Sequence, residues 1–542
     1  MATAKRMLGS SLVASFVLNH YAPPYAVAHS YLWTAVVLFI VQFLSWGLYT
    51  VILYPAFLSP LRHLPEPPGA SLINGHASRI LKEPSGAPFR EWVEHVPNDG
   101  LIRYKFLFNK ERVLLTSPKA LGEVLVTKNY EFIKPPHLRS GLGRILGIGI
   151  LLAEGEEHKR QRKLLSPAFA FRHVKDLYPL FWSKSIESVA AMTASIKQAS
   201  GTTEKPSNII EIGNWASRAT LDIIGVAGLG QDFHAIEDPD NELNQTYRSL
   251  FSPGRAARVL QLAGMFLPFW LLKRLPVKRN DEIEAASNLI KRTCYDLVQA
   301  KKAKMAKGER TDNDILSVAL ESGGFSDEDL VNQLMTFLAA GHETTASSMS
   351  WATYCLCQHQ DVQHRLREEV RSHLPSITSP TTSITAADID ALPYLSAVCN
   401  EVLRLWSPVP MTLRVAAADA TILGQFIPAG TTVIIAPWAT NTSTQLWGPT
   451  AKEFDPDRWM GEGQAHKGGA DSNYSFLTFL HGPRSCIGQG FAKAEFACLL
   501  AVWVGRFEME LANPDMVVEI KGGITSKPKD GLEVKMNVLE GW

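Results

Sequence analysis

An excess of charge of either sign is missing from this sequence. Lysine and arginine together number 54, aspartate and glutamate 53, so the net charge is +1 at pH 7, and no long basic tract occurs. Nucleic-acid-binding proteins normally carry a basic stripe, so the sequence excludes nucleic acid as a partner. Cysteine is scarce as well, with 6 residues and no C-x-x-C pair. This pattern excludes a disulfide scaffold and indicates a reducing compartment.

Charged side chains are also absent from a long N-terminal stretch, because no Asp, Glu, Lys or Arg occurs between Arg6 and Arg62. Within it, residues 31–58 are almost continuously apolar and long enough to cross about 30 Å of hydrocarbon. They predict a transmembrane helix. Residues 7–28 leave two interpretations open: a first span that forms a hairpin through a Pro-Pro pair, or a signal peptide with an Ala-Val-Ala cleavage site.

The charge that follows the apolar stretch gives the expected orientation. Arg62 is placed on the cytoplasmic side by the positive-inside rule. Residues 1–62 are therefore expected to be a membrane anchor, and residues 63–542 a cytosolic catalytic domain behind a stiff proline-rich connector. A cytosolic domain never meets the glycosylation machinery, so no glycan is expected on the three sequons, which start at Asn244, Asn441 and Asn473.

One cysteine stands in a setting that a metal ligand requires. Cys486 follows Arg484 by two residues, and a nearby cation favours the thiolate that binds metal. Gly482 and Gly488 allow tight turns and a close approach to a flat macrocycle, and Phe479 can keep water from the sulfur. Together these residues predict thiolate ligation of a haem iron through Cys486.

The stretch 479–488 resembles the F-x-x-G-x-R-x-C-x-G motif of the cytochrome P450 family, with every fixed position filled. The resemblance covers the chain from about Pro65 onward. It implies a mainly α fold with a small β region, in which haem b (iron protoporphyrin IX) lies between a long central helix and the helix after the cysteine loop. Phe479, Arg484 and Gly488 would then bind the cofactor, and Cys486 would be the axial ligand of its iron.

A long helix with a polar break lies upstream of this loop. Ser326, followed by three acids, predicts a helix start, and apolar residues continue to about Cys357. A Gly-His-Glu-Thr-Thr run in its middle is costly in a buried helix and resembles the family's oxygen-binding motif. The resemblance assigns Thr344 to the oxygen substrate and Glu343 to the proton relay. A zinc-protease interpretation fails, because Ala346 stands where that motif needs its second histidine.

A basic helix is predicted to begin at Glu154, where the family has W-x-x-x-R for contact with a haem propionate. Arg162 matches the arginine, and His158 replaces the tryptophan, so the contact is expected to become pH-sensitive. The other cations of this helix leave two interpretations open, a docking face for an acidic redox partner or a solvated helix surface. They are Lys159, Arg160 and Lys163.

Further family motifs follow the long helix. Glu401 and Arg404 share a helix face, so they can pair, and they form the family's E-x-x-R motif with Arg458 as its third member. Arg414 matches another propionate-binding arginine of the family. The substrate pocket is expected to be lined by Ala340, Val409, Met411, Thr412 and Ile524.

Short-range patterns add local predictions. Four glycines between residues 141 and 149 do not fit a dinucleotide motif, because Leu146 stands where a glycine is needed; a flexible loop over the substrate pocket is expected instead. The remaining predictions are a β-hairpin over 102–108 and 112–116, a helix over 117–128, polar loops over 200–207 and 301–314, and an apolar segment over 266–272 that belongs to the core, the membrane surface or an entry channel.

The resemblance implies a haem-thiolate monooxygenase at the endoplasmic reticulum, acting on an apolar small molecule of specialised metabolism. Electrons from NADPH would arrive through a separate flavoprotein reductase, with cytochrome b5 as a further candidate partner and membrane lipid around the anchor. Two alternatives remain: a reductase-independent haem-thiolate isomerase or dehydratase, and a non-catalytic membrane haem carrier or sensor. An intact Glu343-Thr344 pair argues against the isomerase.

Overall fold

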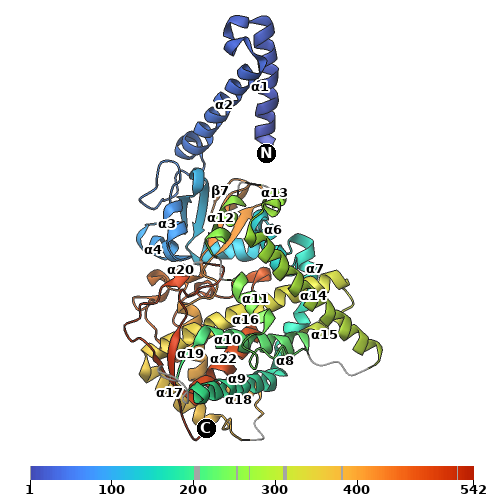
Figure 1. The fold of residues 1–542 in the computed structure, drawn as a ribbon. Helices are drawn as coiled ribbons and strands as arrows, with labels where there is room; N and C mark the ends of the chain where they lie inside the picture. Colours follow the sequence, from blue (N-terminus) through green and yellow to red (C-terminus); the bar gives the residue numbers. More distant parts are fainter. Residues whose placement is uncertain are drawn as a thin grey trace.

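One long helix, α16 (Asp327–Gln358), runs through the middle of the part of the chain that follows the N-terminal helices (Figure 1). The computed structural model describes residues 2–199, 208–251, 254–265, 267, 269–308, 314–379, 383–521 and 523–542. The predicted start of the helix is confirmed: the Asp329 amide donates to Ser326 Oγ at 3.1 Å and the Ser326 amide to Asp329 Oδ2 at 3.2 Å. This reciprocal cap satisfies two amides that a helix start leaves open.

Other helices enclose α16 and bury most of its length. Those in contact with it include α10 (Ile212–Ile223), α14 (Lys278–Ala306), α19 (Pro393–Leu405) and α22 (Gln489–Arg506). Helix α22 also packs on α9 (Tyr178–Ala199), and both belong to the largest apolar core cluster. The chain is therefore mainly α, as the sequence predicted.

The remaining helices are short and surround this core. They are α3 (Ala77–Lys82), α4 (Ala87–His95), α5 (Pro118–Gly122), α6 (Pro136–Leu146), α7 (Gly155–Leu165), α8 (Phe171–Lys175), α11 (Glu242–Leu250), α12 (Arg255–Ala263), α13 (Phe269–Arg274), α15 (Ile315–Glu321), α17 (Gln360–His373), α18 (Ala386–Asp390), α20 (Pro437–Thr440) and α21 (Thr444–Trp447).

A five-stranded sheet forms the small β region. Its order is β1 (Leu101–Lys105), β2 (Glu111–Leu115), β8 (Thr432–Ile435), β5 (Thr412–Ala416) and β3 (Phe132–Ile133). The antiparallel pair β1–β2 confirms the predicted hairpin, with the turn η4 (Leu107–Asn109) between the strands. The smaller sheets contain β4 (Ile209–Glu211), β12 (Glu533–Val538) and β9 (Phe507–Leu511), then β6 (Ala420–Ile422) with β7 (Gln425–Ile427), and β10 (Ile520–Lys521) with β11 (Lys527–Pro528).

Two local predictions are wrong. Residues 136–146 form helix α6 instead of a flexible loop, and Gly147, with φ +66°, ends that helix. Residues 301–306 are the last turns of α14 rather than a polar loop. Residues 200–207 and 309–313 lie outside the described residues. The predicted 117–128 helix is present as α5 continued by the π-type turn η5 (Glu123–Thr127). In the 266–272 segment, the described part from Phe269 onward begins α13.

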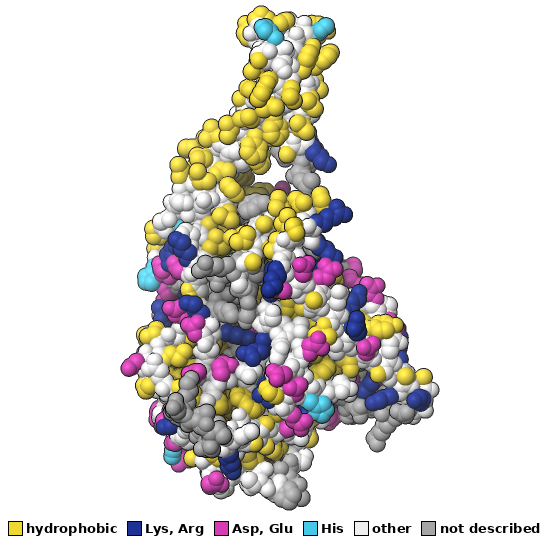
Figure 2. Space-filling model, in the orientation of Figure 1, with side chains coloured by type: hydrophobic (Ala, Val, Ile, Leu, Met, Phe, Trp, Pro, Cys, Tyr) yellow, Lys and Arg dark blue, Asp and Glu magenta, His cyan; other side chains and the backbone are white. Residues whose placement is uncertain are grey.

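The N-terminal residues project away from the domain as two helices side by side (Figure 1). These are α1 (Ala2–Tyr21) and α2 (Tyr31–Leu48), which continues as the π-type segment η3 (Tyr49–Leu58). Residues 31–58 are long and apolar enough to cross a membrane, by length and composition. Hydrophobic side chains cover this projection in Figure 2, whereas charged side chains are spread over the domain.

The end of η3 is attached to the catalytic domain by side-chain hydrogen bonds. Pro55 has no N–H to give the carbonyl of Val51, four residues earlier, and the Asn109 amide donates to that carbonyl at 2.8 Å. Asn109 also donates to the carbonyl of Leu72 at 2.6 Å, and Arg103 of β1 donates to that of Pro55 at 3.3 Å. The projecting N-terminal segment is thus attached to the rest of the chain at the hairpin β1–β2.

Candidate active site

The cysteine loop, residues 479–486, turns back on itself just before α22. The Cys486 amide donates to the Phe479 carbonyl at 2.8 Å, which closes the loop. Gly482 has φ +77°, and a Cβ at this position would lie 2.2 Å from the carbonyl oxygen of Leu125. The contact with η5 therefore requires a glycine here, and the expected approach to a macrocycle stays a prediction. Gly488, with φ −89°, is unstrained, and its amide donates to the Cys486 thiol.

The Cys486 residue combines solvent exposure with a thiol enclosed by protein. The residue is accessible to solvent, yet so much protein surrounds the thiol that burial raises its pKa. The Gly488 amide and the charge of Arg162 act in the opposite direction and lower the pKa. A thiol with these surroundings becomes a thiolate when a metal replaces its proton.

Arg484 does not act on the sulfur, contrary to the sequence-based expectation. Its guanidinium forms an ion pair with Glu154 and donates to the carbonyls of Asn129 at 3.1 Å and Phe132 at 2.9 Å. The cation beside the thiol is Arg162, which donates to the Ser485 carbonyl at 2.6 Å. Sequence distance misled here, because Arg484 ends the tight turn η10 (Gly482–Arg484), from which its side chain reaches Glu154 instead of the sulfur.

Four cationic side chains and one histidine meet close to the cysteine loop, with the carboxylate of Glu154 among them. The cations are Lys134, Arg162, Arg414 and Arg484, and the histidine is His158. Burial and the neighbouring cations lower the pKa of Arg414 to about 10 and hold that of Lys134 well below its usual value. So much buried positive charge requires an anion. The carboxylates of a haem fit this requirement, and the accessible Cys486 thiol supplies the ligand for its iron.

His158, at the position where the family has tryptophan, is buried in this cluster. Its Nδ1 lies 3.0 Å from the hydroxyl of Tyr130, and burial together with Arg484 lowers its pKa to about 4. The ring is therefore neutral at pH 7 and is held in place by Tyr130. The pH sensitivity predicted for this contact consequently lies in the acid range.

The polar break of α16 is built from three different environments. Thr344 donates from Oγ1 to the Ala340 carbonyl at 2.9 Å, and Ala340 is exposed although it lies in the middle of the domain. A Cβ on Gly341 would lie 2.8 Å from Cγ1 of Ile224, so the glycine allows α16 and η7 (Ile224–Leu229) to pack closely. His342 is turned away into the core, with Nδ1 2.7 Å from the Leu338 carbonyl and its ring 4.8 Å from that of Tyr247. Ala340 and Thr344 thus lie on an accessible side of α16, whereas His342 lies in the core.

Glu343 has partners that sequence reasoning missed. Its carboxylate is buried, and its Oε1 lies 2.6 Å from Nζ of Lys527 and accepts a hydrogen bond from Thr525 Oγ1 at 2.9 Å. Lys527 begins β11, more than 180 residues further along the chain. Ile524, expected to line the substrate pocket, was the nearest residue that the sequence singled out, and that expectation concerned substrate contact. The structure therefore adds Lys527 and Thr525 to the site.

Three segments that were expected to line the pocket are tied together. The Ser526 amide donates to the Pro408 carbonyl at 2.8 Å, Ser526 Oγ to the Ser407 carbonyl at 3.0 Å, and Ser347 Oγ to the Ser526 carbonyl at 2.5 Å. This network joins α16, the strand entry before β5 and the C-terminal turn. The predicted pocket residues on these segments are half-buried or exposed: Ala340, Val409, Met411, Thr412 and Ile524. Arg414 shares β5 with Thr412 and donates to its Oγ1 at 3.1 Å.

The predicted Glu401–Arg404–Arg458 triad is confirmed and completely buried at its centre. Arg404 makes two bonds of 2.8 Å to the Glu401 carboxylate, and Arg458 Nε lies 3.0 Å from Glu401 Oε1. Trp459 Nε1 adds a bond of 2.9 Å to Glu401 that the sequence did not indicate. Arg404 also donates to the Asn441 carbonyl at 2.8 Å. Because every partner is satisfied, this triad fixes the loops before the cysteine loop against α19.

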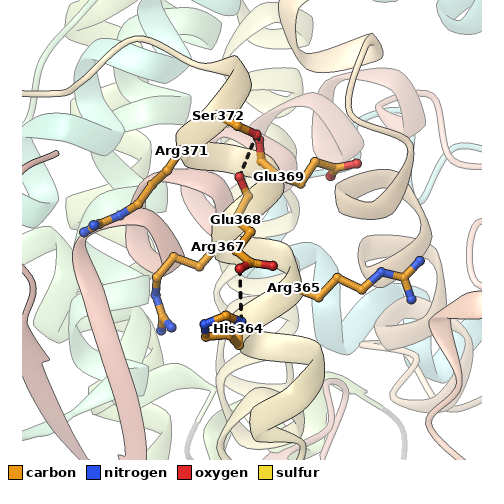
Figure 3. A pocket seen from close by; sticks show the side chains of 7 residues that line it. All are labelled: His364, Arg365, Arg367, Glu368, Glu369, Arg371 and Ser372. Atoms are coloured by element: carbon orange, nitrogen blue, oxygen red, sulfur yellow. Dashed lines mark hydrogen bonds and ion pairs between the residues drawn. The ribbon is translucent and has the colours of Figure 1, made fainter.

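Two other charged surfaces carry no comparable chemistry. On α7, Lys159 pairs with Glu156 at 2.5 Å and Arg160 with Glu157 at 2.7 Å, which favours a solvated helix surface for these two cations. A surface depression of about 770 Å³ lies along α17 (Figure 3). Most of the side chains that line it bind one another or the backbone, for example His364 and Glu368 at 3.6 Å. None of the lining residues comes from the cysteine loop or α16.

Comparisons with known proteins agree with this site. The Cytochrome P450 family model matches residues 65–536. Cytochrome P450 monooxygenase sphH of Aspergillus fumigatus is 49% identical over 529 residues, which cover 96% of each chain. Cytochrome P450 monooxygenase ALT8 of Alternaria alternata is 42% identical (92% of this chain, 93% of that protein), and FUM15 of Gibberella moniliformis 40% (98% and 95%). The chain belongs to the cytochrome P450 family and is an oxidoreductase of its monooxygenase class.

Proposed function

We propose that this protein inserts one atom of O2 into an apolar small molecule of specialised metabolism, at the cytosolic face of the endoplasmic reticulum. Residues 1–62 form the anchor and 63–542 the catalytic domain. Electrons come from NADPH through a separate flavoprotein reductase, with cytochrome b5 as a second candidate donor. The curated relatives are named monooxygenases, which supports the reaction class without naming a substrate.

The residues of the site have distinct parts in this proposal. Cys486 would hold the haem iron, and the cluster of Arg162, Arg414 and Arg484 would neutralise the haem carboxylates, with the neutral His158 ring beside them. Bound in this way, thiolate-ligated haem would supply the activation of molecular oxygen and favour cleavage of its O–O bond. The protein contributes position and protons: the Thr344 hydroxyl lies at the oxygen site, and the carboxylate of the neighbouring Glu343 holds a proton-transfer position near Lys527.

The observation that carries the proposal is the buried Glu343–Lys527 ion pair directly behind Thr344. An isomerase needs no external protons or electrons, so it has no use for a carboxylate–lysine pair beside the oxygen site. A haem carrier would need a second axial ligand, and His342, the nearby imidazole, packs into the core instead. Both arrangements favour the monooxygenase over its two rivals.

A reconstitution experiment tests the proposal. Microsomes that contain the protein are screened with apolar metabolites for a change in the spin state of the haem, and each hit is incubated with reductase and NADPH under 18O2. We expect one 18O atom in the product and no turnover without NADPH. Reductase-independent turnover of a peroxide substrate would replace the monooxygenase by the isomerase.

A further inference from the structure

The two N-terminal helices place polar side chains between them and apolar side chains on their outer surface, the reverse of the arrangement in a soluble protein. Between α1 and α2 the buried side chains are small and mostly polar: Ser11, Ser15 and Thr34 are at most 1% exposed, and Ala35 is 6% exposed. On the outside, large apolar side chains are 48–63% exposed, such as Phe16 on α1 and Trp33, Ile40 and Leu44 on α2. Figure 2 shows this hydrophobic covering around the projection. Such a unit is stable only when apolar solvent surrounds both helices.

Hydrogen bonds run along the seam between the two helices. Ser10 Oγ donates to Gln42 Oε1 at 2.9 Å, and Gln42 Nε2 donates to Ser11 Oγ at 3.2 Å. Nearer the turn, Ser15 Oγ donates to the Tyr31 carbonyl at 2.5 Å, and Asn19 Nδ2 to Thr34 Oγ1 at 3.3 Å. In lipid, where water does not compete, polar side chains of this kind hold neighbouring helices together. The serines of this seam and Asn19, which weaken the apolar character of α1, thus have partners on α2.

The ends of the hairpin match the two faces of a bilayer. Helix α1 has 20 residues and is about 30 Å long, close to the thickness of the hydrocarbon layer. Its charged residues, Lys5 and Arg6, lie at the end near the domain, as does Arg62, and the turn of residues 22–30 lies at the far end (Figure 1). That turn region carries Tyr, His and Pro residues, the polar and aromatic types found at a membrane interface.

We propose that residues 2–58 enter the bilayer together as a helical hairpin, so that α1 is a second membrane helix and not a cleaved signal peptide. The N-terminal end and the catalytic domain lie on the same side, and the turn of residues 22–30 reaches the opposite face. The occupant of the apolar outer surface is membrane lipid. This inference rests on the membrane attachment proposed above and adds the second helix and the position of the turn.

Labelling in sealed microsomes tests the topology. Tyr25, which lies in the turn and is 79% exposed, is changed to Cys. The parent chain serves as the control, because all of its cysteines except Cys486 are buried. We expect a membrane-impermeant maleimide to label Tyr25→Cys only after the membrane is permeabilised, and an epitope before residue 2 to be removed by protease in sealed vesicles. Labelling without permeabilisation, or a mature chain that begins after Ala28, would overturn the hairpin.

Cross-linking tests the seam. Ser11→Cys with Gln42→Cys is expected to be joined by a short bifunctional thiol reagent, so that the two helices stay together after cleavage at a protease site inserted in the turn. The matched control is Leu12→Cys with Gln42→Cys, because Leu12 is 54% exposed on the outer surface and should not be joined. Equal cross-linking of both pairs would refute the seam. The haem absorption and the protease sensitivity of the domain, read in the same vesicles, report separately on the proposed function.

Discussion

Nζ of Lys527 lies 2.6 Å from Oε1 of Glu343, so the acid of the oxygen-binding motif is held by a cation from the far end of the chain. The Glu343 side chain is 2% exposed and that of Lys527 28%, so the pair extends from the interior toward solvent. Thr525 fixes the same carboxylate oxygen through its hydroxyl. A carboxylate held by both partners keeps one orientation next to Thr344.

Removal of the cation should impair proton delivery. In Lys527→Met the buried Glu343 carboxylate loses its partner, and an unpaired interior charge is strongly disfavoured. We expect the share of NADPH electrons that appears as hydrogen peroxide to rise several-fold and the solvent isotope effect on product formation to change. Lys527→Arg, which keeps the charge, should stay close to the native protein. Equal coupling in the Lys527→Met and native proteins would show that Lys527 has only a structural part.

The hydroxyl of Thr344 should control where the oxygen goes. Thr344→Ala removes this hydroxyl and its bond to the Ala340 carbonyl, so NADPH consumption should continue with more peroxide and less product. The matched control is Thr353→Ala, because Thr353 makes the same type of bond, to Met349 at 2.9 Å, more than two turns further along α16. If both variants are coupled equally well, Thr344 is not part of the mechanism.

Cys486 should be the only cysteine that the haem spectrum requires. Cys486→Ser replaces the thiolate ligand, so the red-shifted band of the reduced, carbon-monoxide-bound protein should disappear. Cys357→Ser, at the C-terminal end of α16, should keep the band, since burial raises the pKa of Cys357 to about 12 and leaves it an inert thiol. A Cys486→Ser protein that retains the band would mean that another side chain is the ligand.

Only one of the three sequons reports on topology. Asn244 and Asn441 are fully buried, and the Asn441 side chain donates to Thr478, whereas Asn473 is exposed. With the domain in the cytosol, mass spectrometry should find no glycan on Asn473. As a control, a fusion that directs residues 63–542 into the lumen should be glycosylated at Asn473. A glycan on the native protein would reverse the proposed orientation.

The joint between anchor and domain should be sensitive at Asn109. This residue has φ +50°, so Asn109→Gly keeps the backbone and removes only the amide that binds Val51 and Leu72. We expect a loss of about 1 to 3 kcal/mol in the free energy of unfolding, together with faster proteolysis between residues 58 and 70. Asn513→Gly, at an exposed turn, controls for the added chain entropy. Unchanged proteolysis in Asn109→Gly would show that the joint contributes nothing.

Local chemistry explains what the sequence determined. The spacing of Phe479, Cys486 and Gly488 is a property of one short loop, and Glu401 with Arg404 needs only the helix repeat to pair. The start of α16 at Ser326 follows from its own capping residues. The Glu401–Arg404 pair and the central helix could therefore be predicted from the sequence alone, as could the apolar stretch of residues 31–58, and the role of Cys486 as iron ligand stays a prediction.

Tertiary structure decided the contacts between distant segments, because no local pattern encodes which surfaces meet. In the folded chain Arg484 forms an ion pair with Glu154, and Arg162 lies beside the sulfur of Cys486, although Arg484 is nearer to Cys486 in sequence. Tertiary structure brought Lys527 to Glu343 across more than 180 residues. It also showed that the serines of α1, which lower its hydropathy, form hydrogen bonds with α2. Side-chain direction and partner choice depend on the whole packed chain, whereas motif spacing depends only on neighbours.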